Sequence, residues 1–191
     1  MNMANPRIIS GKAKGLRLKT PPGSITRPIM DRVKEALFNI INGDIIASHF
    51  LDLFAGSGSV GIEALSRGAE YVRFIENNPR AYEITKENIK ASKLGDNADL
   101  LHMDAFKYIE SFETQIRFDY AYIAPPQYKE LWSKMLLLLD VNIQHLNSYA
   151  WVICQIDPVE YQTIELINLF EFDIRQYGDT LMVFYSFKKS V

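Results

Sequence analysis

Apolar and polar positions alternate in blocks along the chain, and the period of each block predicts its secondary structure. Short apolar runs of strand type are separated by longer segments in which apolar residues recur every three or four positions, as on a helix. A first helix is predicted from Asp31, where the apolar spacing becomes helical. The strands that follow are predicted at 50–55, 71–75, 99–102, 118–123 and 150–156. The helices between and after them are predicted at 60–67, 80–91, 105–112, 130–139 and around 159–169.

The C-terminal segment departs from this alternation. Two strand-like runs, 170–176 and 180–187, are joined by Tyr177-Gly178-Asp179, a turn short enough to force antiparallel pairing. The preceding strand–helix alternation predicts right-handed crossovers and a parallel sheet covered on both faces. We therefore expect an α/β, Rossmann-like domain whose mostly parallel seven-stranded sheet ends in an antiparallel hairpin.

The N-terminal segment adds a small basic element to this domain. Short strands at 7–9 and 16–19 around a turn at 11–15 predict a β-hairpin extension, and Pro21-Pro22-Gly23 breaks the chain after it. We place the extension at residues 1–26 and the Rossmann-like domain at 27–191. Residues 1–34 carry eight Lys or Arg against one acid, for a charge of +7; since the whole chain carries −2, the remainder sums to −9. This asymmetry favours a polyanionic partner over the alternative, a solvated basic arm.

Composition narrows the class of protein. The 191 residues are 48% hydrophobic and 23% charged, which is typical of one globular domain. The N-terminus lacks the apolar run of a secretory signal, and no run reaches the roughly 18–20 residues that span a bilayer. The single cysteine, Cys154, lies in an apolar run, so we expect it to be buried and to form neither a disulfide nor a metal site. We expect a cytoplasmic monomer without a membrane or metal partner.

A glycine-rich loop at residues 52–61 carries the clearest chemical signal. Gly56, Gly58 and Gly61 match the GxGxxG pattern between a predicted strand and a predicted helix, where glycines let a nucleotide approach the backbone. Glu76 ends the next strand, 20 residues after Gly56, where a carboxylate can accept hydrogen bonds from ribose hydroxyls. The alternative is a turn needed only for packing. The combination predicts an adenosine-type cofactor.

The acid before the glycines separates two cofactors. A dinucleotide places its pyrophosphate at the helix N-terminus, where the carboxylate of Asp52 would repel it. S-adenosylmethionine carries a cationic methionine end that Asp52 would attract, so we favour it over a nicotinamide cofactor and an oxidoreductase activity. Asp104 and Ala105 follow the third strand and could face the adenine, although Asp104 could equally cap a helix. The cofactor-binding candidates are Asp52, Phe54, Gly56, Ser57, Gly58, Glu76, Asn77, Asp104 and Ala105.

Four segments together resemble one known family. They are Arg7-Ile-Ile-Ser-Gly11, Arg27-Pro-Ile-Met-Asp-Arg-Val-Lys-Glu-Ala-Leu-Phe-Asn39, Leu51-Asp-Leu-Phe-Ala-Gly-Ser-Gly58 and Gly61-Ile-Glu-Ala-Leu-Ser-Arg-Gly68. The chain resembles the RsmD family of 16S ribosomal RNA guanine-N2 methyltransferases over nearly its whole length. The resemblance implies a class I methyltransferase fold, S-adenosylmethionine, and methylation of a guanine N2 amine in ribosomal RNA or an assembling small subunit. It also implies that the N-terminal hairpin and residues 27–34 hold RNA, with the candidates Arg7, Lys12, Lys14, Arg17, Arg27 and Arg32.

The end of the fourth strand departs from that family. The usual motif is Asp or Asn, then Pro-Pro, then an aromatic; here the residues are Ala124, Pro125, Pro126, Gln127 and Tyr128. In the usual motif the acid or amide accepts from the target amine, and the aromatic stacks on the flipped base. Ala124 has only its backbone carbonyl for that task, and Tyr128 stands one position later than the usual aromatic. The site could work through main-chain carbonyls, could serve another acceptor, or could bind RNA in ribosome assembly without catalysis.

Overall fold

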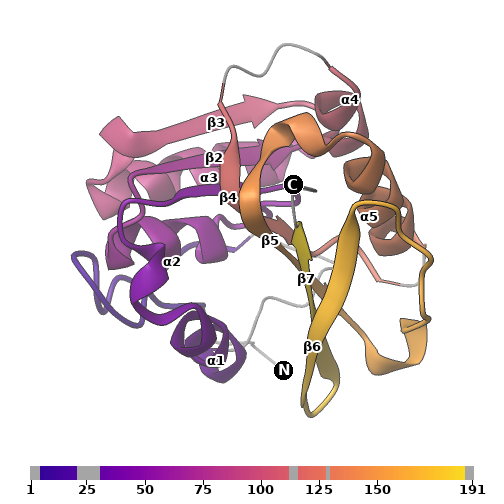
Figure 1. Cartoon of the computed structure of the whole chain (residues 1–191). Helices are drawn as coiled ribbons and strands as arrows, with labels where there is room; N and C mark the ends of the chain where they lie inside the picture. The colour runs from indigo at the N-terminus through magenta and orange to yellow at the C-terminus, as the bar shows by residue number, and fades with distance from the viewer. Residues whose placement is uncertain (1–4, 21–30, 112–115, 128–129, 188–191) are drawn as a thin grey trace.

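The computed structural model of the chain describes residues 5–20, 31–111, 116–127 and 130–187 (Figure 1). The helices in this part are α1 (Asp31–Ile41), α2 (Ser59–Arg67), α3 (Pro79–Ser92), α4 (Ala105–Glu110) and α5 (Leu131–Val141). The strands are β1 (His49–Asp52), β2 (Tyr71–Glu76), β3 (Ala98–His102), β4 (Phe118–Ile123), β5 (Leu146–Ile156), β6 (Leu169–Tyr177) and β7 (Thr180–Phe187). Short 3₁₀ turns lie at Asn42–Ile45, Gly95–Asn97, Ile143–His145 and Pro158–Glu160.

The strands form one sheet in the order β3-β2-β1-β4-β5-β7-β6. β1 pairs in parallel with β2 and β4, and the outer pairs β2–β3 and β4–β5 are also parallel. β7 runs antiparallel to both β5 and β6. The predicted fold class, a Rossmann-like sheet that ends in an antiparallel hairpin, is therefore confirmed. Because the sheet grows outward from β1 in both directions, β1 and β4 flank the switch point where such sheets bind ligands.

Two hydrophobic cores lie on the two faces of the sheet. Helices α1, α2 and α3 pack on one face together with residues 8 and 18 of the N-terminal segment, and α4 and α5 pack on the other. Figure 1 shows α4 and α5 on the side of the sheet away from α1 and α2. Successive β1 residues feed opposite cores, Phe50 the first and Leu51 the second, and both are fully buried. Such burial on both faces explains the nearly continuous apolar strands of the sequence.

The predicted helix around 159–169 is wrong. Only the 3₁₀ turn Pro158–Glu160 forms there, and no helix follows it before β6 begins at Leu169. The carboxylate of Asp140 in α5 accepts hydrogen bonds from the backbone N–H groups of three consecutive residues, 167 to 169, at 2.7–2.8 Å. A helix would direct those N–H groups to its own carbonyls instead. Val159 and Ile167 are 79% and 82% exposed and no residue from 157 to 168 is fully buried, so the segment also lacks the fully buried apolar face that would stabilise a helix.

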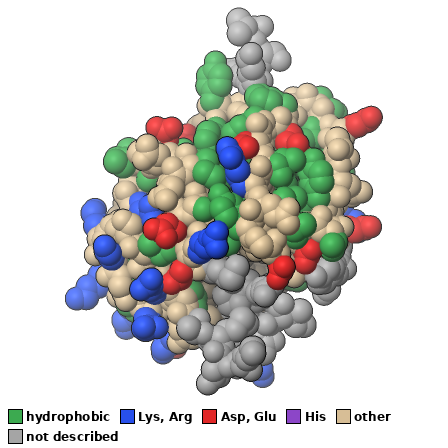
Figure 2. All heavy atoms as spheres, turned by 90° about the horizontal axis from the view of Figure 1, so that it is seen from below, with side chains coloured by type: hydrophobic (Ala, Val, Ile, Leu, Met, Phe, Trp, Pro, Cys, Tyr) green, Lys and Arg blue, Asp and Glu red, His purple; other side chains and the backbone are tan. Residues whose placement is uncertain are grey.

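The N-terminal residues 5–20, which we call the arm, fold back on themselves as expected, although with little regular strand. The predicted strands are reduced to one antiparallel bridge, Arg7 to Arg17, flanked by backbone hydrogen bonds. Ile8 and Leu18 are buried in the first core, so the arm is packed against the domain. The predicted boundary after residue 26 lies outside the described residues. Seen from below, Lys and Arg side chains gather on the side where the arm lies in Figure 1 (Figure 2).

Within the described residues, no helix is long and apolar enough to cross a membrane. Cys154 is fully buried in the second core, as the sequence predicted, and burial raises the pKa of its thiol. The thiol is therefore protonated and unreactive at neutral pH.

Candidate cofactor and active site

The four parallel strands β1 to β4 end at one edge of the sheet, and the predicted site residues follow those ends. β1 ends at Asp52, β2 at Glu76, and β4 at Ile123, directly before the Pro-Pro turn. β3 ends two residues before Asp104. The topology therefore brings together the cofactor candidates and the predicted catalytic turn, which are up to 75 positions apart in the sequence.

The loop between β1 and α2 is tied to both neighbouring strands. Leu53 donates a backbone hydrogen bond to the carbonyl of residue 122 in β4 (3.1 Å), and Ala55 donates one to residue 75 in β2 (3.0 Å). The third glycine of the pattern serves packing: a Cβ on Gly61 would lie 2.2 Å from Cε1 of Phe74. This glycine lets α2 approach β2 closely, which holds the loop in place at the switch point.

Asp52 is buried beneath this loop. Its side chain is 1% exposed, and Oδ2 accepts a hydrogen bond from the Gly61 N–H at 3.2 Å. Burial raises the pKa of Asp52 to about 7, and the nearby charge of Glu76 adds to the rise. From the sequence we expect an ionised carboxylate at Asp52, but its burial makes the charge depend on what lies beside it. A cation near this carboxyl would lower its pKa and favour the charged form.

Glu76 is held in position through both of its carboxylate oxygens. Oε2 accepts from the Gly56 N–H and Oε1 from the Asn78 N–H, each at 2.7 Å. A carboxylate offers about four acceptor positions, so about two remain for other donors. The glycine loop thus fixes an acceptor beside itself, and this arrangement fits the paired hydroxyls of a ribose.

The segment after β3 combines a helix cap with an aromatic contact. Oδ1 of Asp104 accepts from two backbone N–H groups in the first turn of α4, at 2.9 and 3.2 Å, so the capping interpretation is confirmed. Ala105 is buried. The ring of Phe54 meets the edge of Phe106, a residue that the sequence analysis missed, with centroids 6.5 Å apart. Asn77 is exposed, and its carbonyl accepts from the ring of a histidine at the end of β3.

The Pro-Pro turn lies beside the glycine loop because β4 pairs with β1. Pro125 is buried, whereas Ala124, Pro126 and Gln127 are partly exposed. Ala124 packs against the first core, which also includes Ala55 of the glycine loop and residues of α2. Tyr128 lies outside the described residues. The turn therefore presents backbone carbonyls and one amide side chain, but no carboxylate, at this edge.

Two buried polar residues of α3 hold the loop from below, and the sequence analysis missed both. Thr85 donates from Oγ1 to the Gly56 carbonyl (2.8 Å). Asn88 donates from Nδ2 to the carbonyls of Ser57 (2.8 Å) and Lys19 (2.9 Å), and its Oδ1 accepts from the Lys19 N–H (2.9 Å). One feature of the sequence could have revealed them: they are polar residues three positions apart, on the face of an amphipathic helix that is expected to be apolar.

Comparison with known proteins identifies the family. The family model described as "Conserved hypothetical protein 95" matches residues 6–186. The "Ribosomal RNA small subunit methyltransferase D" of Haemophilus influenzae is 36% identical over 137 residues, 71% of either chain. The chain belongs to the RsmD family of methyltransferases.

Solved structures agree with this assignment. The structure named "Putative methyltransferase yhhF from Escherichia coli" superposes with a TM-score of 0.84 at 27% identity, covering 96% of this chain and 98% of that one. An RNA methyltransferase from Salinibacter ruber, solved in complex with S-adenosyl-L-homocysteine, superposes with a TM-score of 0.62 at 16% identity. It covers 86% of this chain and 96% of its own, and it shares the fold.

The predicted RNA-binding residues of this family member divide into exposed and engaged groups. Lys12, Lys14, Arg17 and Arg32 are exposed. Arg7 is exposed too, but it forms an ion pair with Asp31 at 2.8 Å. Arg27 lies outside the described residues.

Lys34 corrects the expectation that residues 27–34 hold RNA throughout. It is fully buried, donates to the Arg7 carbonyl (2.7 Å) and Ser59 Oγ (2.9 Å), and lies 3.4 Å from Glu63. Burial lowers its pKa, although Glu63 opposes the change. A buried ammonium with these partners fastens the arm to α2 and is not available to a phosphate.

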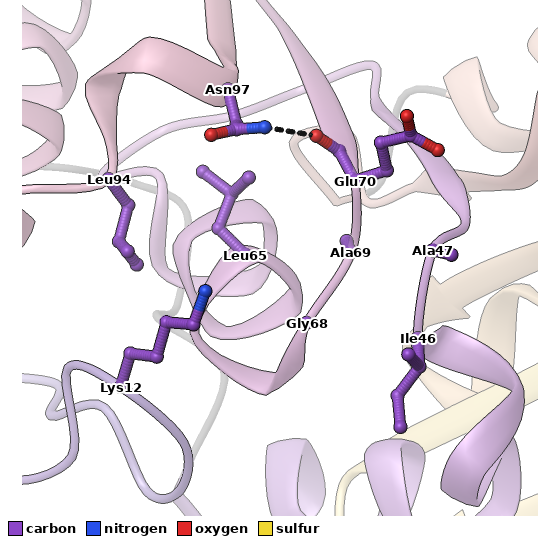
Figure 3. Close-up of a pocket in the computed structure, with 9 residues that line it drawn as sticks. All are labelled: Lys12, Ile46, Ala47, Leu65, Gly68, Ala69, Glu70, Leu94 and Asn97. Carbon is purple, nitrogen blue, oxygen red and sulfur yellow. Dashed lines mark hydrogen bonds between the residues drawn. The ribbon is translucent and has the colours of Figure 1, made fainter.

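A surface hollow of about 410 Å³ lies at the opposite edge of the sheet (Figure 3). Lys12 of the arm and Leu94 face it from one side, and Ala47 and Glu70, which precede β1 and β2, line the other. Because these residues are at the amino ends of the strands, the hollow is separate from the candidate site. Among the described residues, no group of three or more His, Cys, Asp or Glu could hold a metal ion.

Proposed function

We propose that this chain transfers a methyl group from S-adenosylmethionine to the N2 amine of a guanine in small-subunit ribosomal RNA. One arrangement carries the proposal: Glu76, held by the glycine loop, and the Pro125-Pro126 turn lie at the same sheet edge on either side of β1. The Haemophilus influenzae relative is named for small-subunit ribosomal RNA. This placement supports the cofactor contacts and the position of the target amine that we propose.

The residues around the loop suit the parts of S-adenosylmethionine. Glu76 would accept from the ribose hydroxyls, Asp104 and Ala105 would lie toward the adenine, and Asp52 toward the methionine end. Asp52 becomes charged when a cation lies beside it, so its burial favours binding of a cationic ligand over an anionic one. When bound, the cofactor supplies a methyl group on a sulfonium, which leaves as a neutral thioether.

The Pro-Pro turn would hold the target amine. The Ala124 carbonyl accepts one N–H of the amine and so orients its lone pair toward the methyl carbon. Held in this way, the amine would accept the methyl group that the cofactor supplies, and its extra proton would pass to water. The Gln127 amide can hydrogen-bond a base edge, and stacking on the base falls to Tyr128.

Ribosomal RNA is the partner we propose for the exposed basic residues. The residues we assign to this contact are Arg7, Lys12, Lys14, Arg17 and Arg32, all exposed, with Arg27 added from the sequence. We further propose a cytoplasmic monomer in which residues 1–26 extend the domain at 27–191. Light scattering after size-exclusion chromatography tests the oligomeric state.

Methyl transfer is the direct test. Purified protein is incubated with S-adenosylmethionine labelled in its methyl group and with unmodified small-subunit RNA, free or in particles, and the RNA is digested to nucleosides. We expect label in N2-methylguanosine, and its absence with Glu76→Ala, which removes the ribose acceptor. Measurable cofactor binding without transfer to either RNA form would contradict the proposal.

Ala124 favours one second candidate, an RNA-binding assembly protein that keeps the fold without catalysis. The variant that combines Ala124→Asp and Gln127→Phe restores the usual motif of the family. Activity in this variant alone would establish the second candidate. Comparable activity in both proteins would exclude it and show that the backbone carbonyl suffices.

A further inference from the structure

Helix α3 extends the exposed basic surface of the arm. The arm lies along this helix: Lys19 exchanges two backbone hydrogen bonds with Asn88, and its Nζ forms an ion pair with Glu87 at 2.7 Å. Farther along, Lys12 and Leu94, just past the end of α3, line the same hollow (Figure 3). Arm and helix therefore lie side by side from the middle of α3 to its C-terminal end.

The neighbouring face of α3 is basic. Lys86, Lys90 and Lys93 are all exposed, and their spacing of four and three places them along one side of the helix. With the exposed arm residues Lys12, Lys14, Arg17 and Lys19 they make seven cations, which we call the flank surface. The exposed acids beside them are four: Glu83, Glu87 and Asp96 on and after α3, and Glu70, which lines the hollow with Lys12.

The acids leave the flank surface with a clear positive excess. Glu83 lies 4.0 Å from Lys86 and Glu87 pairs with Lys19, both as exposed ion pairs that phosphate groups can displace. The described arm contains no acid at all. Figure 2 shows basic side chains gathered on this side of the molecule.

The flank surface leads away from the candidate active site. α3 begins at Pro79, three residues after the end of β2, at the sheet edge that holds the candidate site. Its 14 residues span about 21 Å toward the opposite edge. The arm turn lies there too, since the Lys12 N–H donates to the carbonyl of Ser66 in the last turn of α2. An RNA that reaches from the Pro-Pro turn to the far end of the flank surface therefore extends about 20 Å from the target base.

The chemistry of the flank surface indicates what part of the RNA it meets. Single strands are bound by aromatic side chains on which bases stack, whereas duplex RNA is recognised through its backbone and shape. The arm and the row from Lys86 to Lys93 contain no aromatic residue, and the ring of Tyr82, one turn before Lys86, is partly buried against the ring of His102. We infer that the flank surface binds the phosphate backbone of an RNA helix that adjoins the target nucleotide. This inference rests on the proposed function for its RNA partner.

Salt-dependent binding tests the inference. The variant combines Lys90→Gln with Lys93→Asn; asparagine is chosen because Lys93 has φ +58°, a conformation that asparagine tolerates. The control, Lys134→Gln with Arg175→Gln, removes the same charge from α5 and β6. Each protein is titrated, at several salt concentrations, with a stem-loop RNA and with an unstructured RNA of equal length. Melting temperatures confirm that all are folded.

We expect wild type to bind the stem-loop more tightly than the unstructured RNA. The slope of log affinity against log salt for the stem-loop should fall by about 2 in the variant, about 1 per lysine, and stay unchanged in the control. Equal slopes in variant and control would contradict the claim that the flank surface binds RNA phosphates. If wild type binds the unstructured RNA as tightly as the stem-loop, and the variant loses as much slope with it, the claim that the surface binds an RNA helix is contradicted. Slope loss without methyl transfer by any of the proteins would leave this inference standing and contradict the proposed function.

Discussion

Replacing Asn88 with alanine should weaken both the fold and cofactor binding, because one side chain serves both the arm and the loop. Its amide is 2% exposed and makes three hydrogen bonds, two to Lys19 and one to Ser57. A hydrogen bond of this kind contributes about 1 kcal/mol, so the substitution should lower the free energy of unfolding by about 3 kcal/mol. Urea unfolding measures this change, with an unaltered m-value showing that the folded state stays compact.

Cofactor affinity gives the second readout for Asn88→Ala. The loss of the bond to Ser57 releases one anchor of the loop, and we expect about tenfold weaker binding of S-adenosylhomocysteine, or about 1.4 kcal/mol, by calorimetry. RNA affinity should fall as well, since the arm loses both of its bonds at Lys19. Thr85→Val separates the effect on the cofactor from the effect on RNA, because Thr85 bonds to the loop carbonyl of Gly56 and not to the arm; it should weaken cofactor binding and leave RNA affinity unchanged.

Ser92→Ala is the matched control for stability. Ser92 is buried in the same helix, but its hydroxyl bonds only locally, to the Ile89 carbonyl and the Leu94 N–H. With two hydrogen bonds lost, we expect a loss of about 2 kcal/mol and unchanged cofactor affinity. The reasoning is refuted if Asn88→Ala is no more destabilising than Ser92→Ala, or if its cofactor affinity equals that of wild type.

Three further substitutions test the site. Since burial raises the pKa of Asp52 from 3.8 to about 7, wild-type stability is highest with the carboxyl protonated and falls as pH rises through this range. Asp52→Asn cannot ionise, so its stability relative to wild type should rise by about 2–3 kcal/mol between pH 5 and 8 in urea unfolding; a constant difference would contradict the shift. Glu76→Gln should lower S-adenosylhomocysteine affinity by about 1–3 kcal/mol, since an amide replaces a charged acceptor, and unchanged calorimetric affinity would remove Glu76 from the ribose site. Gly61→Ala places a methyl group 2.2 Å from Phe74 and should cost about 1–3 kcal/mol of stability, with partial recovery on adding Phe74→Leu. Equal loss with and without the second change would show that the ring is not the obstacle.

The sequence predicted what depends on local period and on neighbours along the chain. All seven strands were predicted, because each strand carries its own apolar run: β4 and β7 at their bounds, four others within three residues, and β5 with its start four residues late. The predicted helix around 159–169 was wrong because of a residue distant in the sequence. Asp140 in α5 captures the backbone N–H groups of 167–169, and a contact over 27 positions leaves no periodic trace.

The same distinction applies to the candidate site. Glu76 could be predicted because it ends a strand at a fixed distance from Gly56, and the two are joined by a hydrogen bond. Asn88 could not, since its partners lie 69 and 31 positions away. A glycine pattern specifies where the backbone turns, whereas the side chains that hold the turn come from elements that only the tertiary fold brings near.

Charge counting had the same limit at the N-terminus. Lys34 adds to the basic excess of residues 1–34, yet it is fully buried against Glu63. Glu63 also accepts from the Ile9 and Ser10 N–H groups, so both charges depend on the arm for partners. Without the arm, the ammonium and the carboxylate would lose these hydrogen bonds, which is unfavourable for charges that remain buried. The arm is therefore part of the folded unit, and the cations it exposes are held at fixed positions relative to the cofactor loop.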